Sequence, residues 1–167
     1  MTTAVASTVN SSEEPKEEAL FKNLFRRLIA TDAGWAAIAL RIPVGIIFAA
    51  HGAQKLFGWF GGHGLQGTGQ WMASIGLEPG YLMALLAGGA EFFGGLALIV
   101  GLLVRPAAAV LAFTMAVAIF AVHIGNGLFM SNDGYEFGLA LLAVSISLAI
   151  SGAGRASVDR LLAGPRD

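Results

Sequence analysis

The stretch HGAQKLFGWFGGHG, residues 51–64, sets polar side chains that can bind a ligand or carry a proton among glycines and aromatic residues. His51 and Lys55 are four residues apart, so they share one face if a helix continues through them. Such groups can donate hydrogen bonds to a carbonyl, and a neighbouring carboxylate can exchange a proton. The alternative is that each is an ordinary polar residue at a membrane surface. Near the ends of the apolar runs, the candidate ligand-binding residues are His51, Gln54, Lys55, His123 and Glu136.

Two familiar ligand motifs fail on their context. Residues 62–67, GHGLQG, match G-x-G-x-x-G, but a dinucleotide site needs a preceding strand, and an apolar run of helical length precedes this match. The phosphate-loop pattern G-x-x-x-x-G-K-[ST] does not occur. His51, His63 and His123 could join a glutamate as metal ligands, but none has the close spacing typical of metal sites. We predict neither a nucleotide site nor a metal site.

The composition is that of an integral membrane protein. Of 167 residues, 56% are hydrophobic and 13% are charged, and the mean hydropathy is +0.71. A soluble domain has about 25% charged residues. The net charge of −1 gives no indication of nucleic-acid binding. The chain has no cysteine, which excludes disulfides, thiol redox chemistry, iron–sulfur clusters and thiolate zinc sites. No intrinsic cofactor is evident, so electron chemistry would need a non-covalently held molecule, such as a quinone, or a partner subunit.

Four apolar runs are long enough to form helices that cross most or all of a ~30 Å hydrocarbon layer. Their continuous character argues against the ~10-residue alternating strands of an outer-membrane barrel. Pro106 is suited to the first turn of the third run. We therefore predict an all-α integral membrane protein with a four-helix transmembrane bundle over residues 32–155. The expected spans are about residues 35–51, 81–104, 106–123 and 135–151.

Two further segments precede the bundle. Residues 1–18 are small, polar and acidic, which predicts a disordered tail, and they lack the basic and apolar stretches of a secretory signal. Residues 19–31 place apolar side chains on one helical face and lysine and arginine on the other. That pattern is typical of an amphipathic helix lying in the membrane interface. The alternative is a helix that packs on a soluble partner.

The distribution of basic residues predicts the orientation. With four spans, the side of the membrane that holds both termini carries Lys16, Lys22, Arg26, Arg27, Arg105, Arg155, Arg160 and Arg166. The opposite loops carry Lys55 beside Glu78, Asp133 and Glu136. The positive-inside rule therefore places both termini, including a tail over residues 156–167, in the cytoplasm.

Two charged residues fall inside the predicted spans. Arg41 lies roughly 9 Å from the cytoplasmic end of the first span, and Glu91 roughly 15 Å below the opposite surface, at 1.5 Å per residue. A charge at the bilayer centre costs at least about 2.5–3.5 kcal/mol, so such residues face the bundle interior and find partners. We predict an Arg41–Glu91 ion pair. It could belong to a ligand site, or it could only fix the register of the helices.

Glycines surround these charges. Small residues let helices approach closely in lipid, so we expect a packing role for this set. The glycine-rich segment between the first two spans also carries tryptophan and phenylalanine, which favour the headgroup level. We expect it to fold over the outer end of the bundle as a partial lid, with a short interfacial helix over residues 70–77. The predicted structural glycines are Gly45, Gly52, Gly88, Gly89, Gly94 and Gly95.

The first span and its loop resemble the DoxX family of small four-helix bacterial membrane proteins, over roughly residues 34–155. The family pattern of an arginine, a glycine and phenylalanine, and G-x-x-K-L-F is matched by Arg41, Gly45, Phe48, Gly52, Lys55, Leu56 and Phe57. In the second span, AEFFGGLALIVGL is similar to the family at Glu91 and Gly95. The family takes its name from a subunit of a thiosulfate:quinone oxidoreductase, so the resemblance implies a quinone-linked or redox-partner role. It implies no catalytic residues.

Three functions are compatible with these observations. The chain could be a membrane subunit of a redox assembly that binds a quinone or a similar lipid-soluble molecule. It could be a non-enzymatic scaffold or accessory subunit whose buried charges serve assembly. Less favoured is a small transporter, which would require a homo-oligomer because four spans form a narrow bundle. The expected surroundings are the lipid bilayer and a redox partner subunit or further copies of the chain.

Overall fold

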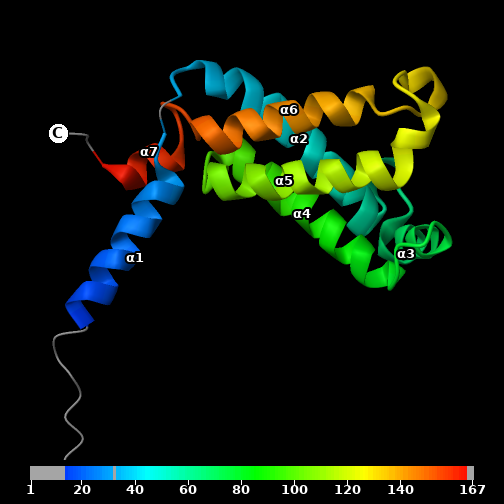
Figure 1. Cartoon of the computed structure of the whole chain (residues 1–167), viewed down its shortest axis with the longest axis horizontal. Coiled ribbons are helices and arrows are strands. Elements are labelled where there is room, and N and C mark those ends of the chain that lie inside the picture. The colour runs from blue at the N-terminus through cyan, green and yellow to red at the C-terminus, as the bar shows by residue number, and fades with distance from the viewer. Residues whose placement is uncertain (1–13, 32, 165–167) are drawn as a thin grey trace, which may run out of the picture.

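The computed structural model describes residues 14–31 and 33–164, which form helices and no strand (Figure 1). The α-helices are α1 (Glu14–Ile29), α2 (Ala36–Phe57), α3 (Gly64–Ser74), α4 (Gly80–Val100), α5 (Val104–Ala118), α6 (Glu136–Ser151) and α7 (Val158–Ala163). The helix of α5 continues through a π-helical turn, Ile119–His123, and a 3₁₀ turn, Ile124–Asn126. Further 3₁₀ turns lie at Trp59–Gly61 and Met130–Asn132. The predicted all-α class is confirmed.

Three helices are long and apolar enough to cross a membrane. They are α2 with 22 residues, α4 with 21, and α5 with its extension to Asn126, 23 residues in all. The apolar helix α6 packs along α5 but has only 16 residues (Figure 1). Its length is about 24 Å, less than a ~30 Å hydrocarbon layer. Three spans therefore support the membrane assignment, and the fourth stays a prediction.

The outer surfaces of the long helices are apolar. Phe93 on α4 and Phe113 on α5 are 65% and 71% exposed, and Phe120 beyond α5 is 72% exposed. Soluble monomers rarely expose large contiguous apolar patches, whereas membrane helices present such side chains to lipid. The surroundings of these helices are thus a lipid bilayer. The interior holds side chains from four helices, Phe48, Leu98, Leu111 and Leu148, all at most 1% exposed.

Glycines bring α2 and α4 into backbone contact. A Cβ atom at Gly45 would lie 2.8 Å from the Gly95 carbonyl oxygen, and one at Gly52 would lie 2.7 Å from the Gly88 carbonyl oxygen. Gly45 therefore faces Gly95 and Gly52 faces Gly88 across two antiparallel helices. Small residues at such a crossing are what close approach in lipid requires.

The other two predicted structural glycines differ from each other. A Cβ at Gly94 would lie 3.0 Å from Leu111 of α5, so this glycine faces the bundle. At Gly89 a Cβ would meet nothing within 4 Å in the described part of the chain. Gly89 is on the face of α4 turned away from its neighbours, so close packing gives no reason for a glycine there.

The segment between α2 and α4 covers one end of these helices. The short helix expected over residues 70–77 is longer and starts earlier, since α3 runs from Gly64 to Ser74 and packs on α4 and α2. Gly80 allows this packing, because a Cβ there would lie 2.8 Å from the backbone nitrogen of Ala73. Three glycines within α3 lower its helix propensity, and for this reason the sequence did not predict its full length.

At the other end of the bundle, α1 leaves at a steep angle to the long helices (Figure 1). It begins at Glu14, five residues before the expected start at residue 19, so residues 14–18 belong to the helix. Glu18 and Lys22 form an i,i+4 ion pair of 2.5 Å across that extension. The rest of the predicted tail, residues 1–13, lies outside the described residues. The interfacial position of α1 stays a prediction.

Candidate functional site

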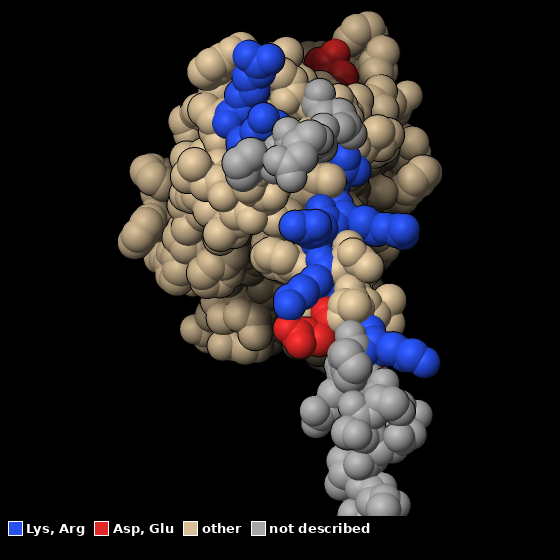
Figure 2. Space-filling view, turned by 90° about the vertical axis from the view of Figure 1, so that its left-hand side faces the viewer, with Lys and Arg blue, Asp and Glu red and all other residues tan. Residues whose placement is uncertain are grey.

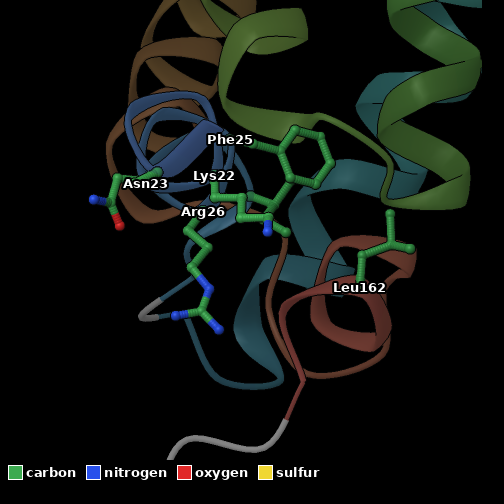
Figure 3. Close-up of a pocket in the computed structure, with 7 residues that line it drawn as sticks. Lys22, Asn23, Phe25, Arg26 and Leu162 are labelled. Atoms are coloured by element: carbon green, nitrogen blue, oxygen red, sulfur yellow. The ribbon is translucent and has the colours of Figure 1, made fainter. Parts of the chain in front are cut away.

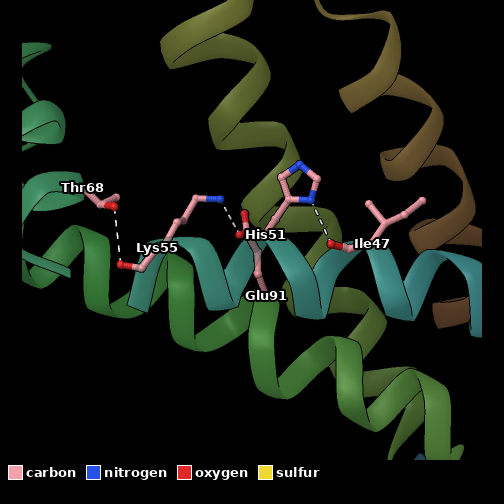
Figure 4. Close-up of polar contacts among 5 residues, drawn as sticks. All are labelled: Ile47, His51, Lys55, Thr68 and Glu91. Carbon is pink, nitrogen blue, oxygen red and sulfur yellow. Dashed lines mark hydrogen bonds and ion pairs between the residues drawn. The ribbon is translucent and has the colours of Figure 1, made fainter. Parts of the chain in front are cut away.

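An ion pair between two membrane-spanning helices forms the centre of the candidate site. The Lys55 ammonium lies 2.5 Å from a Glu91 carboxylate oxygen, joining the last turns of α2 to the middle of α4 (Figure 4). The Glu91 side chain is 4% exposed and that of Lys55 is 25% exposed. The carboxylate is thus enclosed by protein, while its lysine partner reaches the surface of the chain.

The predicted Arg41–Glu91 ion pair is wrong, and helix geometry explains the difference. Side chains of an α-helix lean toward its N-terminus. Because α2 and α4 are antiparallel, Lys55 and Glu91 lean toward each other. Arg41 leans away from Glu91 and lies opposite Ile99, eight residues, or about 12 Å, farther along α4.

Arg41 instead binds the C-terminal end of α4. It is 2% exposed, and its Nη1 donates to the carbonyl oxygens of Leu98 and Ile99, each at 2.8 Å. Its Nη2 donates to the carbonyl oxygen of Ala156, in the segment after α6. The last carbonyls of a helix have no partner within the helix and attract a cation. Arg41 is therefore a buried cap that joins α2, α4 and the C-terminal segment.

Gly101 is required at this cap. Its φ is +77°, and a Cβ there would lie 2.6 Å from Arg41 Nη1 and 2.6 Å from Cβ of Ser157. Glycine is the residue that tolerates both the left-handed backbone and the close approach.

Asp159 completes the same junction, and sequence reasoning missed it. Its carboxylate accepts hydrogen bonds from the backbone N–H groups of Leu103 at 2.7 Å and Val104 at 2.9 Å, at the start of α5. Burial raises the pKa of Asp159 above its usual value, against the opposing effects of these two donors and of Arg41. The sequence predicts a tail from residue 156, but residues 156–164 dock on the bundle. Ser157, whose Oγ accepts from the Arg160 N–H as a helix N-cap, was the available signal.

Two more predicted site residues lie near the ion pair on α2. His51 projects from the same side of α2 as Lys55 (Figure 4). Its Nδ1 donates to the Ile47 carbonyl oxygen at 2.9 Å, and its ring centroid lies 6.3 Å from that of Phe137 on α6. Gln54 donates from Nε2 to the Phe60 carbonyl oxygen at 3.2 Å and so holds the start of the lid.

His123 and Glu136 make local contacts within the loop between α5 and α6. His123 Nδ1 donates to the Asp133 carbonyl oxygen at 2.7 Å. Glu136 accepts through Oε1 from the backbone N–H of Met130 at 2.7 Å. The five polar groups expected to converge therefore divide. Lys55 binds Glu91, His51 contacts Ile47 and Phe137, Gln54 binds the lid, and the other two make contacts within their own loop.

A hollow of about 340 Å³ lies between α2 and the lid. Two of the predicted site residues, Gln54 and Lys55, line it, and Trp71 of α3 lines it as well. The Thr68 hydroxyl donates to the Lys55 carbonyl oxygen at 3.4 Å and joins α3 to α2 beside it (Figure 4). Among the residues described, no group of three His, Cys, Asp or Glu side chains could hold a metal ion. The hollow is lined by Gln54, Lys55, Gly61, Gly62, His63, Thr68 and Trp71.

The unequal exposure of the two charges predicts unequal effects of mutation. Lys55→Met is expected to destabilise the protein by about 3–5 kcal/mol, because it leaves a buried carboxylate without its cation. Glu91→Gln should cost less, since the lysine reaches the surface. The double variant should recover part of the loss seen in Lys55→Met. Thermal unfolding, followed by size-exclusion chromatography in detergent, measures the stability of all three variants. If Glu91→Gln lost as much stability as Lys55→Met, or more, the result would contradict the described burial.

Known proteins are similar to most of this chain. The model of the DoxX family matches residues 36–124. "Putative oxidoreductase CatD" of Bacillus subtilis is 36% identical over 122 residues, which cover 73% of this chain and 83% of that protein. The "Inner membrane protein YqjF" of Escherichia coli is 35% identical over 131 residues, 75% of this chain and 90% of that protein. "Inner membrane protein YphA" of the same organism is 29% identical, over 72% and 85% of the two chains.

No solved structure matches the chain. The family match includes α2, α3, α4 and α5, and with them both partners of the Lys55–Glu91 pair and the Arg41 cap. The extent of the family match, the level of identity and the apolar helices lead to one conclusion: this chain belongs to the DoxX family of membrane proteins.

Proposed function

We propose that the chain is the membrane subunit of a redox assembly and that it binds a quinone, or a similar lipid-soluble molecule, beneath the lid. One observation carries the proposal. An acid and a base meet between two membrane-spanning helices, and the base, Lys55, also lines a hollow at the end of the bundle. Ionisable residues inside membrane helices are functional candidates because burying them costs free energy.

The residues at the hollow suit a flat molecule with carbonyl oxygens. The Lys55 ammonium has three donors, one of which Glu91 occupies, so a second can bind a ligand carbonyl. Trp71 lines the hollow, and an aromatic side chain is suited to stacking on a flat ring. A quinone takes up two electrons and two protons on reduction. Lys55 and Glu91 can pass protons, and the electrons come from a partner protein of the proposed redox assembly.

The relatives support a redox role in general terms. The Bacillus subtilis relative carries the name of an oxidoreductase, and the Escherichia coli relatives are named as inner membrane proteins. From these we infer an inner-membrane location for this chain, with both termini in the cytoplasm by the distribution of lysine and arginine.

A scaffold without ligand is the second candidate, favoured by a separate observation. Arg41 and Asp159 use their charges on backbone groups at helix ends, which is a purely structural use of buried charge. If the Lys55–Glu91 pair has the same use, it fixes the register of α2 and α4 and takes no part in a reaction.

Native mass spectrometry of the protein, purified in mild detergent from its native membranes, separates the two candidates. The redox proposal expects a bound quinone mass that Lys55→Gln and Glu91→Gln both remove. Arg27→Gln, on the exposed surface of α1, is the control that should retain it. Absence of quinone, together with unchanged quinone reduction in membranes that lack the protein, would leave the scaffold as the function.

A further inference from the structure

A second hollow, of about 470 Å³, lies between α1 and α7 at the opposite end of the bundle from the lid (Figures 1 and 3). Its polar lining residues are Lys22, Asn23 and Arg26 of α1. Its apolar lining residues include Phe25 and Ile29 of α1 and Leu162 of α7, and Figure 3 shows Phe25 next to Lys22, with Leu162 across the open space from them. The hollow thus presents two cations beside an apolar wall.

This hollow has a fixed place relative to the membrane-spanning helices. Ile29 is 1% exposed, and Arg105 at the start of α5 donates from Nε to the Ala30 carbonyl oxygen at 2.7 Å. The Thr31 hydroxyl accepts from the Gly154 N–H at 2.6 Å, just after α6. The end of α1 is therefore anchored where α4 and α6 end and α5 begins, which is the level of a membrane surface.

Positive charge collects at this end of the molecule. Figure 2 views the end from outside and shows lysine and arginine side chains following one another across it. The contributing elements are α1, with Lys16, Lys22, Arg26 and Arg27, the first turn of α5 with Arg105, and the C-terminal segment with Arg155 and Arg160. An anionic surface is the complement of this charge.

The free face of α1 is apolar. Leu20 and Phe21 are each 69% exposed, and Leu24 is 55% exposed. An amphipathic helix of this kind places its apolar face at the boundary of headgroups and acyl chains, and its basic residues among the headgroups. Continuity with the spans brings α1 to that boundary, so lipid is the occupant that meets both the charge and the apolar wall.

We propose that α1 and α7 form a binding site for an anionic phospholipid of the leaflet that contacts them. Lys22 and Arg26 bind the phosphate. An arginine can donate two parallel hydrogen bonds to two phosphate oxygens, and a lysine supplies a point charge. The acyl chain lies against Phe25, Ile29 and Leu162. The exposed pair of Lys22 with Glu18 does not prevent this, because surface ion pairs contribute little.

The experiment uses the full-length protein in detergent, with phosphatidylglycerol and phosphatidylcholine of identical acyl chains added in equal amounts. Native mass spectrometry then measures the ratio of the two lipid adducts. The Lys22→Gln/Arg26→Gln variant is expected to lose the preference for phosphatidylglycerol by about tenfold or more, given the free energy of each basic contact with an anionic headgroup. Retention volume on size-exclusion chromatography checks that the variant is folded.

The matched control is Lys16→Gln/Arg27→Gln, which removes the same charge from α1 at exposed positions that do not line the hollow. It should keep the preference within about threefold of the native protein, because it leaves the two phosphate contacts in place. Leu162→Ser should weaken the binding of both lipids to a similar extent. Equal losses in the two double variants, or no preference for phosphatidylglycerol in the native protein, would overturn the proposal.

Discussion

Replacing Arg41 by leucine is expected to lower the stability of the folded protein by about 3–5 kcal/mol. The change removes the hydrogen bonds to the buried carbonyl oxygen of Leu98 and to the partly buried carbonyl oxygens of Ile99 and Ala156. A carbonyl buried without a donor costs about 1–3 kcal/mol. Arg41 is 2% exposed, so the hydrogen bonds that it makes are shielded from water in the native protein.

The size of the loss should depend on donor geometry rather than on charge alone. Arg41→Lys keeps the charge but has a single nitrogen, which cannot span carbonyls of two separate segments, so an intermediate loss is expected. Thermal unfolding in detergent, followed by the monodisperse fraction, measures the series. A decrease of about 10 °C or more for Arg41→Leu corresponds to the expected free energy. Arg27→Gln, an exposed arginine of α1, is the control. Equal stability of Arg41→Leu and the control would show that the cap does not hold the bundle together.

The second large effect is expected at the crossing of α2 and α4. At Gly52 a Cβ would overlap the backbone nitrogen of Phe92 and lie 2.7 Å from the Gly88 carbonyl oxygen. Both are backbone atoms, so neither can move aside as a flexible side chain could. Gly52→Leu must therefore push the helices apart, at a cost of about 3 kcal/mol, the upper part of the range for overpacked sites.

The separation should also break the Lys55–Glu91 pair, which is held three residues away on each helix. In the Gly52→Leu background, Glu91→Gln should then have little further effect on stability. Gly89→Ala is the control on α4, because a Cβ there meets nothing within 4 Å in the described residues, and it should not destabilise the protein. Comparable losses at Gly52 and Gly89 would contradict the observed crossing.

Composition and apolar periodicity were enough to predict the helical membrane fold. The length of an apolar run can be read from the local sequence alone, and that length decides whether a helix can span the hydrocarbon layer. They also selected Arg41, Lys55 and Glu91 as unusual residues. The pairing among them could not be predicted from depth along each helix. It depends on the direction in which side chains lean and on the register that the glycines set between α2 and α4.

The docked C-terminal segment shows a different limit. The segment after residue 155 is short and partly polar, so composition alone predicts a tail. Asp159 is buried because the turn between α4 and α5 presents two backbone donors to it, an arrangement that exists only after those helices have packed. The lid helix α3 was predicted too short for a related reason. Its glycines weaken the local helical signal, and packing on α4 supplies the stability instead.

The most direct test of the proposed ligand site uses tryptophan fluorescence. Of the three tryptophans, Trp71 lines the hollow beside Lys55, whereas Trp35 precedes α2 at the other end of the bundle. A variant that keeps only Trp71 should be quenched by a short-chain ubiquinone in a saturable manner. Glu91→Gln or Lys55→Gln in that background should remove the saturable part, and a variant that keeps only Trp35 should show none. Linear quenching of equal slope at Trp71 and Trp35, unchanged by substitution of Lys55 or Glu91, would contradict a quinone site beneath the lid.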